Sequence, residues 1–75
     1  MQEKLDLRGT PCPLNFVRCR LMLEKLPMKE TLVVDLDIGE PEDMVISALK
    51  EEGYLIKIIT RGSDWLRISI ASNAS

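Results

Sequence analysis

The fold is decided by a short alternating segment that runs into a cysteine between two prolines, Lys4-Leu5-Asp6-Leu7-Arg8-Gly9-Thr10-Pro11-Cys12-Pro13. Polar and apolar residues alternate over 4–8, which predicts a strand, and the Gly-Thr-Pro that follows ends it. Pro13 disfavours helical geometry at the residue before it and suits the first position of a helix. We therefore expect a strand, a stiff turn and a helix that begins at Pro13, with Cys12 as its N-cap residue.

The rest of the chain continues the alternation of strands and helices. Residues 13–26 form a helix whose apolar face holds Phe16, Cys19, Met22, Leu23 and Leu26. Residues 31–37 are a strand, and Gly39-Glu40-Pro41 opens a second helix with Pro41 at its first position. That helix has an inner stripe of Val45, Ala48 and Leu49 and ends before Gly53. Residues 54–60 and 64–71 are two strands joined by a hairpin turn.

The order βαβαββ predicts an α+β fold in two layers. Each β-α-β step predicts parallel strands with a right-handed crossover, so both helices cover one face of a single sheet. The other sheet face is then partly open, and strand alternation places on it Val33, Leu55, Ile59, Trp65 and Arg67.

Cys12 is the residue best suited to chemistry. An N-cap sulfur lies where the free N–H groups and the positive end of the helix dipole favour a thiolate, which lowers the thiol pKa below about 8.5. The sequence contains no histidine, so a Cys–His hydrolase is excluded. A thiolate exchanges sulfur without a base. The alternative is an incidental cysteine before a helix.

The segment from Leu5 to Pro13 resembles the opening strand and Cys-Pro-x-Pro motif of the TusA/SirA/YedF sulfur-carrier family. Gly39-Glu40-Pro41 and the Gly53-Tyr54 step are also similar to that family. The resemblance implies an initiation-factor-3 C-terminal-like fold, with a four-stranded mixed sheet of order 1-2-4-3. It also implies a persulfide on Cys12, received from a cysteine desulfurase or other persulfide donor and passed to a downstream acceptor protein. Members serve tRNA thiolation, molybdenum cofactor synthesis or sulfur oxidation, and the resemblance leaves the pathway open.

Asn15 stands where the family motif has its second proline. We expect it to support the thiolate with its backbone N–H and its amide side chain, beside Pro11 and Pro13. Cys19 lies on the apolar helix face, which favours a core cysteine over a resolving one. The acidic residues of 35–43 are interpreted as a solvated face because they lack the spacing of a calcium loop.

A docking surface for the donor is predicted around Cys12. The first 30 residues carry six Lys/Arg and four Asp/Glu, a charge of +2, within a chain of net charge −2. The tentative surface consists of Arg8, Val17, Arg18, Arg20 and Leu21. A solvated helix face of ordinary charge is the alternative. Trp65 could equally cover the sheet edge or bind a partner.

Composition bounds the remaining expectations. The 75 residues form one domain, 1–75, with a loose tail at 72–75. No apolar run reaches the roughly 18 residues of a membrane span, and the N-terminus lacks the apolar core of a signal peptide, so we expect a cytoplasmic monomer. We expect no metal, cofactor or direct DNA binding. Two other functions stay open: a redox-sensing or regulatory module of the same fold, and RNA binding by the open sheet face.

Overall fold

A computed structural model describes residues 2–11, 13–27 and 30–71. The elements follow the predicted order: β1 Gln2–Asp6, α1 Leu14–Lys25, β2 Thr31–Asp37, α2 Glu40–Glu51, β3 Leu55–Arg61 and β4 Trp65–Ala71. Cys12 and the predicted loose tail at 72–75 lie outside the described residues.

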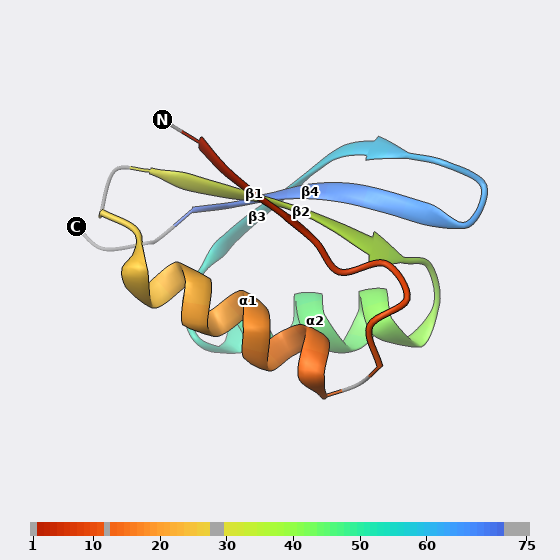
Figure 1. The fold of residues 1–75 in the computed structure, drawn as a ribbon, viewed down its shortest axis with the longest axis horizontal. Coiled ribbons are helices and arrows are strands. Elements are labelled where there is room, and N and C mark those ends of the chain that lie inside the picture. The colour runs from red at the N-terminus through yellow and green to blue at the C-terminus, as the bar shows by residue number, and fades with distance from the viewer. Residues whose placement is uncertain (1, 12, 28–29, 72–75) are drawn as a thin grey trace.

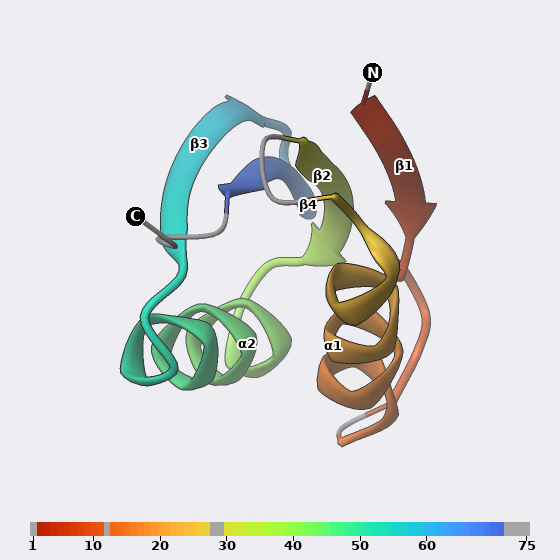
Figure 2. The same cartoon turned by 90° about the vertical axis from the view of Figure 1, so that its left-hand side faces the viewer.

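The sheet has the order β1-β2-β4-β3, as the family resemblance implied. β1 pairs with β2 in parallel, and β4 pairs with β2 and β3 in antiparallel fashion. Both helices lie side by side on one face of this sheet, which gives the predicted two layers (Figures 1 and 2). The turn that follows β1 and the first turn of α1 lie at the same end of the molecule (Figure 1).

The core fills the space between the helices and the two central strands. Alternate residues of β2 and β4 point toward the helices, because side chains alternate across a sheet. They are paired in register as Leu32 with Ile70, Val34 with Ile68 and Leu36 with Leu66, and all six are fully buried. The helices contribute Cys19, Leu23, Val45 and Leu49, so the predicted apolar faces of both helices are confirmed.

Several predicted boundaries are wrong by one or two residues, and three of them concern the surroundings of the predicted thiol or the start of α2. β1 ends at Asp6, because Arg8 and Gly9 already form a turn, although Leu7 is buried in the core. Pro13 is the N-cap of α1 with a ψ of 12°, so the helix begins at Leu14 and Cys12 precedes the cap. Gly39 is the N-cap of α2, which moves Pro41 to the second helical position.

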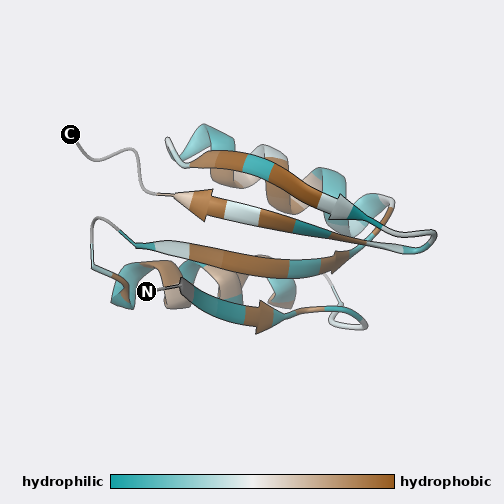
Figure 3. Ribbon diagram, turned by 90° about the horizontal axis from the view of Figure 1, so that it is seen from above, coloured by the Kyte–Doolittle hydropathy of each residue, from teal (hydrophilic) through white to brown (hydrophobic). Residues whose placement is uncertain are grey.

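The face away from the helices is open, as predicted, and Figure 3 views the sheet from above. Trp65 and Arg67 lie on this face because they alternate with the buried residues of β4. At the outer edge, β3 breaks its register with β4 between Ile58 and Thr60, which places Ile59 in a β-bulge.

Candidate functional site

A tight turn leads from β1 toward Cys12. The N–H of Leu7 extends the ladder by donating to Asp35 O at 2.9 Å, and the N–H of Thr10 donates back to Leu7 O at 3.0 Å. Gly9 adopts a φ of +79°, a conformation that residues with a Cβ rarely adopt. Its N–H donates to Asp37 Oδ2 at the end of β2, 2.8 Å away. The turn is therefore held both by its own backbone and by a side chain from another strand.

The first turn of α1 begins immediately after the predicted thiol. Pro11 O accepts the N–H of Asn15 at 3.2 Å, and Pro13 O accepts the N–H of Val17 at 3.1 Å. The second bond is the one expected of an N-cap carbonyl, which supports Pro13 rather than Cys12 as the cap. These two bonds fix the carbonyls of Pro11 and Pro13, the residues on either side of Cys12 in the sequence.

Asn15 differs from the sequence prediction. Its backbone N–H donates to Pro11 O at 3.2 Å, and its support of the Cys12 sulfur stays a prediction because Cys12 lies outside the described residues. The side chain is fully buried, and its Oδ1 accepts the N–H of Phe16 at 2.7 Å. Its Nδ2 has no hydrogen-bond partner among the described residues. The spacing of Asn15 four residues before Cys19 was the signal for this burial, which its polarity concealed.

Cys19 is a core thiol, as expected. It is fully buried, and burial raises its pKa from an ordinary value of 9.0 to about 12. A thiol that stays protonated at neutral pH does not exchange sulfur, because the thiolate is the nucleophile. Cys19 is therefore unsuited to sulfur exchange, and Cys12 lies outside the described residues.

The predicted docking residues divide between two places. Val17 and Leu21 are exposed on α1, at 44% and 54%, and the sequence missed Leu14 at 53%. These three form an apolar stripe on the outer face of α1 that begins at its first residue. Arg18 is exposed on the same helix, whereas Arg20 contacts Glu24 at 3.5 Å and Glu52 at 3.3 Å.

Arg8 lies away from that stripe, over the open sheet face. It makes a paired contact with Asp6, with both Nε and Nη2 3.0 Å from carboxylate oxygens, and this pairing lowers the pKa of Asp6. Its guanidinium is 5.5 Å from the centre of the Trp65 ring. Arg67 lies 5.4 Å from the same ring and bonds Asp35 at 2.7 Å. Trp65 therefore packs with two arginines, a cluster the sequence did not predict.

Trp65 also explains a glycine in the hairpin. A Cβ placed on Gly62 would lie 2.5 Å from Trp65 Nε1, so the indole occupies the space that a side chain would need. Gly62 further donates its N–H to Trp65 O at 2.7 Å. Beside the cluster is a depression of about 240 Å³. It is lined by Lys4, Leu5, Asp6, Val33, Asp35 and Arg67.

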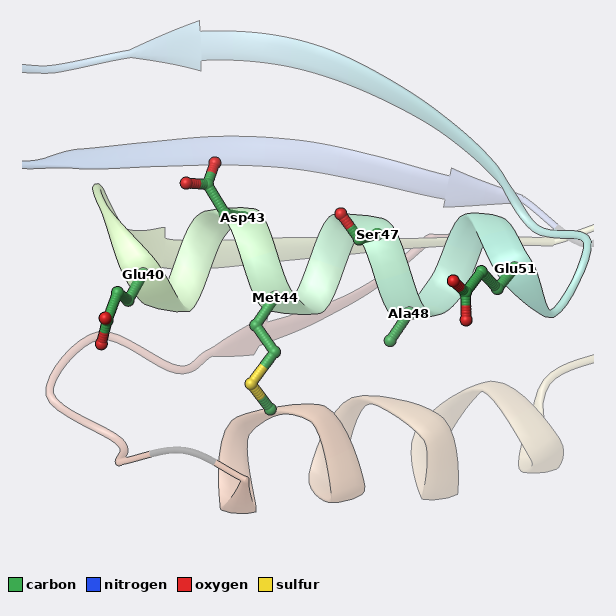
Figure 4. A pocket seen from close by; sticks show the side chains of 6 residues that line it. All are labelled: Glu40, Asp43, Met44, Ser47, Ala48 and Glu51. Atoms are coloured by element: carbon green, nitrogen blue, oxygen red, sulfur yellow. The ribbon is translucent and has the colours of Figure 1, made fainter.

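A second, wider depression of about 630 Å³ runs along the outer face of α2 (Figure 4). Its lining comes from that single helix and consists of Glu40, Asp43, Met44, Ser47, Ala48 and Glu51. Met44 extends from it toward the first turn of α1 (Figure 4). Within the part of the chain that the structure describes, no three His, Cys, Asp or Glu side chains gather to hold a metal ion. Both depressions lie at the surface, one on α2 and one on the open sheet face.

Comparisons with known proteins agree with this geometry. The crystal structure of the SirA-like protein from Desulfitobacterium hafniense is similar, with a TM-score of 0.80. The match covers 99% of this chain and 100% of that one at 17% sequence identity, and at this identity it shows the shared fold. No curated protein matched in sequence.

The described helices are all too short or too polar to cross a membrane.

Comparison of the sequence with family models gives a more specific result than the structural similarity. A family model described as Sulfurtransferase TusA matches residues 3–72, which is nearly the whole chain and includes the cysteine motif. The chain belongs to the TusA sulfurtransferase family.

Proposed function

We propose that this protein is a cytoplasmic sulfur carrier whose working group is the Cys12 thiol. The thiolate attacks the outer sulfur of a donor persulfide, forms a new S–S bond and releases the donor as its own thiolate. Cys12 then carries the sulfur as a persulfide. In the second step an acceptor thiolate attacks that outer sulfur, and the thiolate of Cys12 leaves.

The proposal rests chiefly on the family match across residues 3–72, which contains Cys12 in its motif. The described structure supports it in two ways. The turn before Cys12 and the helix after it are both fixed by hydrogen bonds, which suits a sulfur that must meet a partner's sulfur in one geometry. The second cysteine, Cys19, is buried with a raised pKa, which leaves Cys12 as the thiol suited to exchange.

Supporting roles follow from the surroundings. Pro11 and Pro13 stiffen the chain on both sides of the thiol, and the first turn of α1 adds the positive end of its dipole. Asn15 places a buried amide in that turn, with Nδ2 as a donor unpaired among the described residues. All three favour a charged, oriented sulfur.

The donor, a cysteine desulfurase or another persulfide protein, docks on the α1 stripe in this proposal. Leu14, Val17 and Leu21 supply its apolar centre, and Arg18 supplies a positive charge beside it. Such a surface fits a partner with an apolar patch and an acidic rim. Arg20 adds less charge because Glu24 and Glu52 neutralise it, and Arg8 contributes from the sheet side of the loop. The acceptor is a downstream protein of tRNA thiolation or of another sulfur-trafficking pathway.

Intact-mass measurement after incubation with a cysteine desulfurase and cysteine tests the function. We expect a gain of one sulfur atom that reduction removes and that peptide mapping assigns to Cys12. Cys12→Ala should remain unmodified, and Cys19→Ala is the matched control that should still gain sulfur. A folded Cys12→Ala protein that still carries sulfur would refute the assignment. A wild-type protein that gains none from any persulfide donor would favour the redox-sensing alternative.

A further inference from the structure

The turn between β1 and the thiol has one side-chain tether to another strand among the described hydrogen bonds. The N–H of Gly9 donates to Asp37 Oδ2 at 2.8 Å, across 28 positions of sequence. Of the other N–H groups of the turn, Leu7 donates to Asp35 O and Thr10 donates to Leu7 O, while Arg8 donates to the Asp6 side chain at 3.0 Å. Asp37 therefore fixes the turn at the Gly9 N–H from a strand other than the one that the turn leaves.

This hydrogen bond lies where it can affect the orientation of the chain that leads to Cys12. Gly9 is the residue with positive φ, so it sets the direction in which the chain leaves β1. Residues 10–12 lie between Gly9 and Pro13, the N-cap of α1. Pro11 within this connection and Pro13 at its end each have a fixed φ. A change of direction at Gly9 is therefore passed along a stiff segment to Cys12 instead of being absorbed by soft torsions.

The Asp37 carboxylate is suited to this role. It is the last residue of β2 and is half-buried, opposite Trp65 in the strand register. No salt bridge joins it to a cation within the described ranges, whereas Asp6 and Asp35 are each paired with an arginine. The Arg8 cation interacts favourably with Asp37 without bonding to it, so Asp37 Oδ2 accepts the Gly9 N–H at 2.8 Å.

We propose that Asp37 is a positioning residue for Cys12: its bond to Gly9 orients the thiol turn for sulfur exchange. The inference rests on the proposed function for its consequence in sulfur transfer. Its structural part, the control of the turn and of the thiol's surroundings, is measurable without any sulfur donor.

Asp37→Ala removes the acceptor, and Asp37→Asn keeps an oxygen acceptor while removing the charge. Asp64→Ala is the matched control, since it removes an exposed aspartate side chain that the described bonds do not use. The first measurement is hydrogen exchange at the Gly9 amide. We expect exchange to be about tenfold faster in Asp37→Ala, with Leu7 unchanged and Asp37→Asn close to wild type.

The second measurement is the pH dependence of Cys12 alkylation by iodoacetamide, followed by peptide mapping. Loss of a fixed position at the helix end should raise the pH midpoint by about half a unit in Asp37→Ala. Asp37→Asn should restore the wild-type midpoint. The proposal is overturned if Asp37→Ala leaves the Gly9 exchange rate or the pH midpoint of Cys12 alkylation unchanged. It is also overturned if Asp37→Asn does not restore both values to those of the wild type.

The third measurement is the rate of sulfur loading from a desulfurase. Asp37→Ala should load about tenfold more slowly, and Asp37→Asn should load near the wild-type rate. If the wild type does not load sulfur, the proposed function fails, while Gly9 exchange and Cys12 alkylation still decide the role of Asp37. Normal loading by Asp37→Ala, in a wild type that does load, overturns the positioning role.

Discussion

Cys19 gives a prediction whose size follows directly from its surroundings. Burial raises its pKa from 9.0 to about 12, so at pH 8 about one thiol in ten thousand is ionised, against about one in ten for an ordinary thiol. Ionisation alone should slow alkylation of Cys19 about a thousandfold in the folded protein. The assay is iodoacetamide labelling of Cys12→Ser, in which Cys19 is the remaining cysteine, with the urea-unfolded protein as reference. A folded rate within tenfold of the unfolded rate would refute the burial argument.

The same thiol makes stability depend on pH in a definite direction. Above pH 9 the unfolded chain releases the Cys19 proton while the folded chain keeps it, so stability falls from about pH 9 until the folded pKa near 12. The loss is about 2 kcal/mol by pH 10.5, at 1.4 kcal/mol per unit. Cys19→Ala should cost about 1 kcal/mol at pH 7 and yet be the more stable protein above about pH 10. Other titrating groups are common to both chains, so urea unfolding of the pair at several pH values isolates the effect. Parallel stability curves without a crossing would contradict it.

Three further predictions concern the docking face of α1, the turn beside Cys12, and the packing of Trp65. The double variant Arg18→Glu, Arg20→Glu should load sulfur from a desulfurase more slowly, by an amount that depends on salt, and should keep nearly the same rate of Cys12 alkylation by iodoacetamide. Lys57→Glu on β3 is the control. If the loading and alkylation rates fall equally, or if neither falls, the donor does not dock on this face of α1. Asn15→Pro should keep sulfur loading and raise the pKa of Cys12, because it removes the buried amide from the adjoining turn; a lower pKa from pH-dependent alkylation contradicts this. Gly62→Ala should destabilise the fold by about 1–3 kcal/mol in urea unfolding, because the added methyl overlaps the Trp65 ring. Unchanged stability would show that the indole moves aside without cost.

The elements were predictable because their patterns are local. The apolar spacing in α1 and the alternation in β2 and β4 each report which face is buried, and the structure confirms all three. Boundaries at prolines were less certain, since Pro13 is compatible with both the N-cap and the first helical position. The sheet order came from the family resemblance, because periodicity does not state which strands are neighbours.

Contacts between distant residues were beyond the sequence pattern. Asp37 was interpreted as part of a solvated acidic face, and it binds the N–H of Gly9. Arg8 was assigned to the docking surface by its place in the chain, and its contact with Trp65 on the open face was not predicted. Both interactions join positions at least 28 residues apart and depend on strand register, which a single sequence does not encode in its spacing.

The bulge in β3 affects whether another strand can pair with the edge of this sheet. β3 is a terminal strand, and all its residues except Ile56 are exposed, among them Leu55, Ile58 and Ile59. A straight, apolar edge of this kind is a template for pairing with a second strand and so for aggregation. The extra residue at Ile59 interrupts the regular row of N–H and C=O groups and increases the local twist. An approaching strand therefore meets two short segments that are out of phase with each other, which opposes pairing of β3 with the same edge of a second copy of this chain.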